Sequence, residues 1–121
     1  MNIKLLDPSF EFTDHRGTII EIINGKNWES INHHYRKKGC KCGGHYHKIT
    51  EEYFYIVSGL LEVELQKTDG SEAQTIIVPP LKGLLVPTHY HHNTHFLEDT
   101  NMITMLSRSF NKGDPDTYQD F

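Results

Sequence analysis

Several features are scarce or missing in this chain of 121 residues, and each absence narrows its class. Only two cysteines occur, Cys40 and Cys42, and their spacing is too close for an unstrained bridge between them, which excludes a disulfide scaffold. No apolar run approaches the ~20 residues that cross a bilayer, and the residues after Met1 do not form a signal-peptide core. We therefore expect a cytoplasmic protein with no membrane partner.

A strip of positive charge is also missing. The chain has 12 lysines and arginines against 16 aspartates and glutamates, and the basic residues are scattered along it. Because nucleic-acid binding depends on clustered positive charge, we expect no nucleic-acid partner. The length fits one domain, residues 1–121, with a single modest core.

The apolar residues follow the rhythm of short strands, and no segment carries an amphipathic helix of three turns. We expect strands at residues 18–24, 53–57, 61–66, 75–78, 83–86 and 102–106. Asp69-Gly70 predicts a tight turn that joins two of them in a hairpin. Short strands at close spacing, separated by turn residues, predict an all-β sandwich or barrel.

Histidine, in contrast, is abundant, with nine in the chain. Eight of them form two clusters: His33, His34, His45 and His47, then His89, His91, His92 and His95. Side chains two apart on a strand share a face, so we expect His45 and His47 to point the same way. By the same alternation Glu52 shares a face with the apolar Phe54 and Ile56, and we expect it to point inward.

Two histidines and a carboxylate suit zinc, manganese, iron or nickel, and the second cluster has a fourth ligand to offer. A single H-x-H pair is more often a hydrogen-bonded surface pair. A rival zinc site would join Cys40 and Cys42 to the histidine pair, but it leaves Glu52 and the second cluster without a role. Free thiols on a loop are the simpler account of the cysteines.

The spacing of these residues resembles the two motifs of the cupin superfamily. The first motif is matched by Gly39, His45, His47, Glu52 and Gly59, and the second by Pro87 and His92. Leu81 and His89 stand where cupins usually have glycine, and Phe96 stands where they often have asparagine. The resemblance implies a double-stranded β-helix, or jelly-roll barrel. It also implies one divalent metal ion held by His45, His47, Glu52 and His92.

A narrower resemblance starts at Asp14-His15-Arg16-Gly17, with Glu21 following. This stretch is similar to a signature of cupins that act on nucleotide-linked keto-sugars. These cupins are the dTDP-4-dehydrorhamnose 3,5-epimerases, the dTDP-sugar 3,4-ketoisomerases, and the C-terminal epimerase domain of a capsular UDP-sugar reductase. The last group also resembles the chain at residues 87–93 (PTHYHHN), 99–102 (DTNM) and 115–118 (PDTY). The resemblance implies an epimerase or isomerase of a nucleotide-linked 4-keto-6-deoxy sugar, acting by metal-assisted enolisation in polysaccharide or surface-glycan precursor synthesis.

The same resemblance gives Arg16, with Glu21, the role of binding the nucleotide-sugar, because a guanidinium pairs well with phosphate oxygens. The residues that move the proton stay open. We expect catalysis from Tyr90, His95 and Tyr35, with His34 and His91 as further candidates. Two other function classes remain: a metal-dependent cupin dioxygenase, and a non-catalytic sugar- or metal-binding cupin.

The outer face of the strand at residues 53–57 carries Tyr53, Tyr55 and Val57. An apolar stripe of this kind needs a cover. The strand expected at residues 18–24 is one candidate cover, from within the chain. Because related sugar cupins are commonly dimers, we instead expect a homodimer that covers the stripe with a second copy.

Overall fold

The structure, a computed structural model, describes residues 3–119, and the regular elements in this range are strands. They are β1 (Phe10–Asp14), β2 (Gly17–Glu21), β3 (Ser30–Arg36), β4 (Lys41–His45), β5 (Glu52–Ser58), β6 (Leu61–Lys67), β7 (Gln74–Val78), β8 (Gly83–Val86), β9 (Tyr90–Phe96) and β10 (Thr100–Leu106). Within the described range there is no helix with the length and apolar character needed to cross a membrane.

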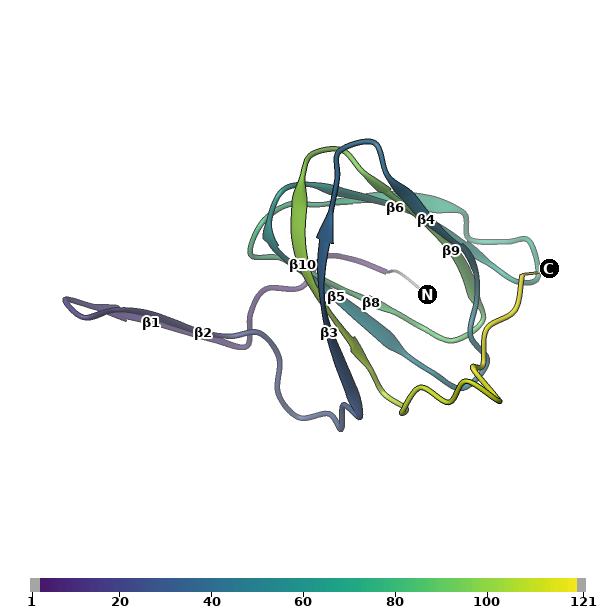
Figure 1. Cartoon of the computed structure of the whole chain (residues 1–121), viewed down its shortest axis with the longest axis horizontal. Coiled ribbons are helices and arrows are strands. Elements are labelled where there is room, and N and C mark those ends of the chain that lie inside the picture. Colours follow the sequence, from purple (N-terminus) through teal and green to yellow (C-terminus); the bar gives the residue numbers. More distant parts are fainter. Residues whose placement is uncertain (1–2, 120–121) are drawn as a thin grey trace.

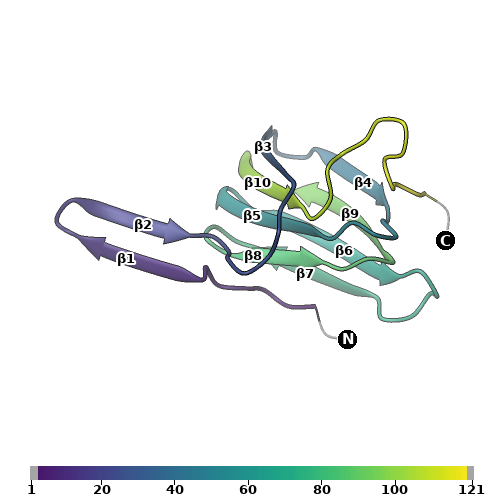
Figure 2. The ribbon, with the colours of Figure 1, turned by 90° about the horizontal axis from the view of Figure 1, so that it is seen from below.

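The strands pair antiparallel in three sheets (Figure 1). One four-stranded sheet has the order β3-β10-β5-β8, and the other has the order β4-β9-β6-β7. Strands β1 and β2 form a separate hairpin, the arm, which projects from one side of the barrel (Figures 1 and 2). The all-β prediction is confirmed.

The strand predictions hold best where apolar and polar residues alternate. The expected hairpin is formed by β6 and β7, with Leu61 opposite Val78, and β8 and β10 lie where strands were expected. The strand expected at residues 18–24 stops at Glu21. Strands β1, β3, β4 and β9 were not predicted. Strands β3 and β9 are rich in polar residues and histidine, β4 contains two glycines, and β1 is short although Phe10 and Phe12 alternate with polar residues.

The core lies between the two four-stranded sheets. Its buried members are Ile3, Phe54, Ile56, Leu61, Val63, Leu65, Val78, Leu84, Val86, Tyr90, Phe96 and Met102. Strand β5 supplies Phe54 and Ile56 to this interior, and Glu52 precedes them on the same face. The inward orientation expected for that face is what the structure has.

The outer face of β5 is covered by the chain itself, which corrects the surface expected for a dimer. Tyr53 is 1% exposed and Tyr55 3% exposed, whereas Val57, the third residue of the expected stripe, stays 38% exposed. They form a second cluster with Met105, against which Ile22, Ile23, Trp28, Leu85 and Ile103 pack. A side chain at Gly83 would collide with the Tyr53 hydroxyl, so glycine makes room for this cluster. The segment after β2 turns away from the arm, and its Ile22 and Ile23 pack against this second cluster.

Two loops keep a left-handed backbone where cupins usually have glycine. Leu81 has φ 65° and His89 has φ 63°, a region that non-glycine residues seldom occupy. Hydrogen bonds hold both: Leu81 N–H donates to the carbonyl of Ile56 at 2.7 Å, and His89 N–H donates to the carbonyl of His47, also at 2.7 Å. The loop before β9 is thereby tied to the segment that carries His47.

Candidate metal centre and cavity

Four side chains from both four-stranded sheets meet at one end of the barrel interior. His45 ends β4, His47 follows it, Glu52 begins β5 and His92 lies in β9. Each offers one ligand atom, and these atoms all lie within 4.8 Å of one another. This ligand set could hold a metal ion, as the sequence predicted.

The backbone of β4 brings His45 against His92. The register of β4 and β9 shifts between Gly43 and His45, so that His45 lies opposite His92. Gly43 has φ +95°, and a Cβ atom there would lie 2.7 Å from the carbonyl oxygen of His92. Only glycine allows this approach, and the imidazole rings of His45 and His92 end with their centroids 4.7 Å apart.

The ring nitrogens of two histidines are oriented by backbone carbonyls. Nδ1 of His47 lies 2.8 Å from the carbonyl oxygen of Asp116, and Nδ1 of His92 lies 3.1 Å from that of Tyr90. A carbonyl only accepts, so both Nδ1 atoms carry hydrogen, and in the neutral ring Nε2 presents a lone pair. Nε2 of His47 is buried without a hydrogen-bond partner among the described residues. A buried, unsatisfied lone pair beside a carboxylate fits a metal ligand.

Glu52 is the charge at the centre of the cluster. Its Oε1 lies 3.5 Å from Nε2 of both His47 and His92. Burial opposes its ionisation, but the facing imidazoles of His47 and His92, which pair with the carboxylate when they are protonated, outweigh burial and lower the pKa of Glu52 to about 2. Burial would also lower the pKa of His47, but the neighbouring carboxylate of Glu52 and the hydrogen bond to the carbonyl of Asp116 raise it. Burial, followed by the neighbouring His92 and His47, lowers the pKa of His45 to about 4.

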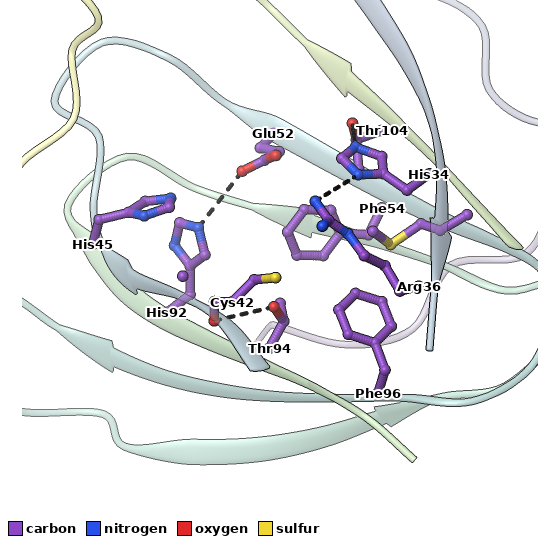
Figure 3. Close-up of a pocket in the computed structure, with 12 residues that line it drawn as sticks. His34, Arg36, Cys42, His45, Glu52, Phe54, His92, Thr94, Phe96 and Thr104 are labelled. Carbon is purple, nitrogen blue, oxygen red and sulfur yellow. Dashed lines mark hydrogen bonds and ion pairs between the residues drawn. The ribbon is translucent and has the colours of Figure 1, made fainter. Parts of the chain in front are cut away.

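Two cavities share His45 and Glu52. The inner cavity, about 150 Å³, lies inside the barrel (Figure 3). It is lined by His34, Arg36, Cys42, Gly43, His45, Glu52, Phe54, His92, Thr94, Phe96, Met102 and Thr104. The outer cavity, about 110 Å³, lies under the segment after β10. It is lined by His45, His47, Thr50, Glu52, Leu106, Arg108, Ser109, Phe110, Pro115 and Thr117.

Across the inner cavity from His45 and His92 lies a second polar group, from β3 and β10 (Figure 3). Arg36 Nη2 donates to Nδ1 of His34 at 3.2 Å, so the neutral ring carries its hydrogen on Nε2 and donates to Thr104 Oγ1 at 3.0 Å. Burial and the charge of Arg36 lower the pKa of His34. No carboxylate among residues 3–119 forms an ion pair with Arg36.

None of the three expected catalytic residues lines either cavity. Tyr35 lies on the outer face of β3, 75% exposed, with its ring centroid 4.5 Å from that of His33. Tyr90 is buried, but its hydroxyl donates to Glu72 at 2.9 Å. His95 lies on the outer face of β9, where its ring is 3.7 Å from Glu62.

Strand alternation could have located these side chains from the sequence. His95 is three residues after His92, so the two histidines lie on opposite faces of β9. Tyr35 stands between His34 and Arg36, so it lies on the face of β3 opposite to theirs. Of the two charged residues that line the inner cavity, Glu52 was predicted and Arg36 was missed, because the position of β3 would have been needed to find it.

The expected substrate-binding residues lie on the arm, away from both cavities. Arg16 sits at the tip, its side chain 76% exposed, and pairs with Asp14 at 2.6 Å. Glu21 ends β2 and accepts a hydrogen bond from Ser9 at 2.9 Å. In a single chain neither residue meets the candidate metal centre.

The cysteines stay apart from the candidate metal centre's ligand set. Cys40 and Cys42 are free thiols with their sulfur atoms 3.8 Å apart, and Cys42 lines the inner cavity. The cluster that the structure brings together contains Glu52 and three histidines instead. The described residues therefore do not form the rival site of two cysteines and two histidines.

Two facing antiparallel sheets with inward histidines and a glutamate near one end define a cupin barrel. The chain belongs to the polysaccharide biosynthesis C-terminal domain family, which matches residues 12–118. No curated protein matches the chain.

Solved structures share this fold. The capsular polysaccharide assembling protein CapF of Staphylococcus aureus is 28% identical with a TM-score of 0.70, and the match covers 92% of this chain and 32% of CapF. The chain thus spans about a third of the length of CapF. A 3,4-ketoisomerase of Helicobacter canadensis is 23% identical with a TM-score of 0.80, covering 99% of this chain and 92% of the other.

A dTDP-4-dehydrorhamnose 3,5-epimerase of Sulfolobus tokodaii is 20% identical with a TM-score of 0.78, covering 95% of this chain and 74% of the other. At these identities the likeness to the isomerase and the epimerase concerns the fold. The resemblance to nucleotide-sugar epimerases and isomerases of the cupin type, which the sequence motifs indicated, is confirmed.

Proposed function

We propose that the protein is an epimerase or ketoisomerase of a nucleotide-linked 4-keto-6-deoxy sugar in polysaccharide precursor synthesis. The observation that carries the proposal is the inner cavity, which has the candidate metal centre at one end and the His34–Arg36 pair at the other. The family match to a polysaccharide biosynthesis domain and the fold shared with a dTDP-4-dehydrorhamnose 3,5-epimerase support it.

The reaction needs removal of a proton from the carbon beside the sugar carbonyl and its return to another face or position. His45, His47, Glu52 and His92 would hold a divalent ion, which supplies Lewis acidity toward the carbonyl oxygen. The apolar rings of Phe54 and Phe96 line the same cavity and limit access of water to the reacting carbon.

His34 is the histidine best placed to move the proton. It lines the inner cavity and is not part of the candidate metal centre. Its lowered pKa keeps the imidazole neutral at pH 7, which a base requires. Arg36, whose guanidinium has no carboxylate partner among residues 3–119, would bind an anionic or carbonyl oxygen of the substrate and so release Nδ1 of His34 to accept a proton.

A homodimer is part of the proposal, now with the arm as its contact. Phe10, Phe12 and Ile19 share one face of the arm and are each at least half exposed. An isolated two-stranded hairpin is marginal in water, so a second copy that packs on this face would stabilise it. The binding role expected for Arg16 would then require the arm to reach the cavity of the other copy.

Incubation with dTDP- and UDP-4-keto-6-deoxyhexoses in deuterated water tests the function. We expect deuterium at carbon 3 or carbon 5 by mass spectrometry and NMR. His34→Gln should lower the exchange rate at least 100-fold, on the scale of a lost general base. His33→Gln, on the opposite face of β3, should leave it unchanged.

Three results would contradict the proposal. Failure of every sugar to exchange would refute the isomerase or epimerase activity. Consumption of dioxygen with another small molecule would favour a cupin dioxygenase instead. Equal rates for His34→Gln and the unaltered protein would remove His34 from the mechanism while leaving the activity in place.

A further inference from the structure

The segment that follows β10 closes one side of the candidate metal centre. It crosses the loop between β4 and β5 and pairs there with Tyr46: Tyr46 N–H donates to the carbonyl of Tyr118 at 2.8 Å, and Tyr118 N–H donates back at 3.0 Å. Pro115 and Thr117 line the outer cavity. Asp116 stands between them and is 2% exposed. A buried carboxylate is costly unless hydrogen-bond donors surround it.

The carboxylate of Asp116 binds the loop that joins two candidate ligands, His47 and Glu52. Oδ2 accepts from the N–H of Ile49 at 2.9 Å, from the N–H of Thr50 at 2.8 Å and from the hydroxyl of Thr50 at 2.9 Å. Oδ1 accepts from the N–H of Lys48 at 3.1 Å. Four donors converge on one carboxylate, so the loop has little freedom to move relative to Asp116.

The main chain of Asp116 binds the candidate ligand itself. Its carbonyl oxygen lies 2.8 Å from Nδ1 of His47, and this bond directs Nε2 toward Glu52. Asp116 has φ 52°, a left-handed conformation that is uncommon outside glycine and that surrounding contacts must hold. The carboxylate bonds to residues 48–50 supply those contacts, so the side chain and the carbonyl act together.

We propose that Asp116 is a positioning residue of the candidate metal centre, fixing the orientation of His47 through its carbonyl and the β4–β5 loop through its carboxylate. The proposal rests on the metal-binding part of the proposed function. It extends the centre to the segment after β10, far in sequence from the ligands. Loss of partners that orient a ligand typically costs about 10- to 100-fold in metal affinity.

Asp116→Asn tests the role with the smallest change of shape. An asparagine has one acceptor oxygen, so its amide N–H₂ must face either Lys48 N–H or the donors of Ile49 and Thr50, and donors then oppose each other. We expect the affinity of the full chain for Zn²⁺, measured by chelator competition, to fall about 10- to 100-fold.

Two control variants separate positioning from general destabilisation. Asp114→Asn alters an exposed aspartate of the same segment that pairs with Arg108, and it should keep the Zn²⁺ affinity of the unaltered chain. Val63→Ala opens a cavity in the core, away from the cluster, and destabilises the fold by a different route. Its Zn²⁺ affinity should stay unchanged at temperatures where it remains folded.

The tautomer of His47 gives a second readout that needs no metal. In the metal-free chain, ¹⁵N NMR of the imidazoles should show hydrogen on Nδ1 of His47, and Asp116→Asn should shift this ring toward a mixture of forms. Unchanged Zn²⁺ affinity together with an unchanged His47 signal would overturn the positioning role. If the unaltered chain binds no divalent ion, the metal part of the function fails, and the His47 signal alone decides: a shift supports positioning, and no shift overturns it.

Discussion

Replacing Glu52 with glutamine removes the central charge of the cluster and keeps its shape. Oε1 of Glu52 lies 3.5 Å from Nε2 of both His47 and His92. Although burial disfavours the carboxylate, its interaction with these two imidazoles lowers the pKa of Glu52 from 4.5 to about 2. A shift of this size corresponds to about 3 kcal/mol of stability, at 1.36 kcal/mol per pKa unit.

The sign of the pH dependence follows from the direction of that shift. A carboxyl whose pKa is lower in the folded state stabilises the fold above its unfolded pKa, here 4.5, and loses this contribution as the pH falls toward 2. The glutamine variant has no such group to titrate. The difference in unfolding free energy between the two proteins should therefore shrink by about 3 kcal/mol between pH 6 and pH 2.

Urea unfolding with a chelator present measures this difference. The ring centroid of the single tryptophan, Trp28, lies 6.1 Å from that of Tyr53, so Trp28 fluorescence reports loss of tertiary structure. Ionisable groups that do not contact Glu52 titrate alike in both proteins and cancel in the comparison. A difference that stays constant from pH 6 to pH 2 would refute the reasoning that the two histidines hold Glu52 ionised.

Three further predictions concern other parts of the chain. Burial raises the pKa of Tyr53 to about 12, so the protein should lose about 2 kcal/mol of stability between pH 10 and pH 12, and urea unfolding of Tyr53→Phe should lack this loss. Elemental analysis should find one divalent ion per chain, and His47→Ala or Glu52→Ala should abolish binding of this ion. Absence of stoichiometric metal after incubation with zinc, manganese or iron would contradict this prediction. Sedimentation equilibrium at micromolar concentration should show a dimer that Phe10→Ser with Phe12→Ser dissociates, and a dimer that persists would exclude the arm as its contact.

The sequence alone determined the local parts of the candidate centre. His45, His47 and Glu52 lie within one strand, loop and strand, so alternation and motif spacing were enough to orient them. The hairpin of β6 and β7 followed in the same way from its turn residues and apolar alternation. These features depend on neighbours in the chain, and such neighbours are visible in a single sequence.

Only the tertiary structure decided which distant segments meet. The pairing of β4 with β9 set His92 against His45, a contact that only the family resemblance had predicted. The position of β3 beside β10 turned His34 and Arg36 into the cavity. The return of the last segment brought Asp116 to His47. The order of strands in a sheet depends on long-range contacts, so the local pattern of each strand carries no record of its neighbour.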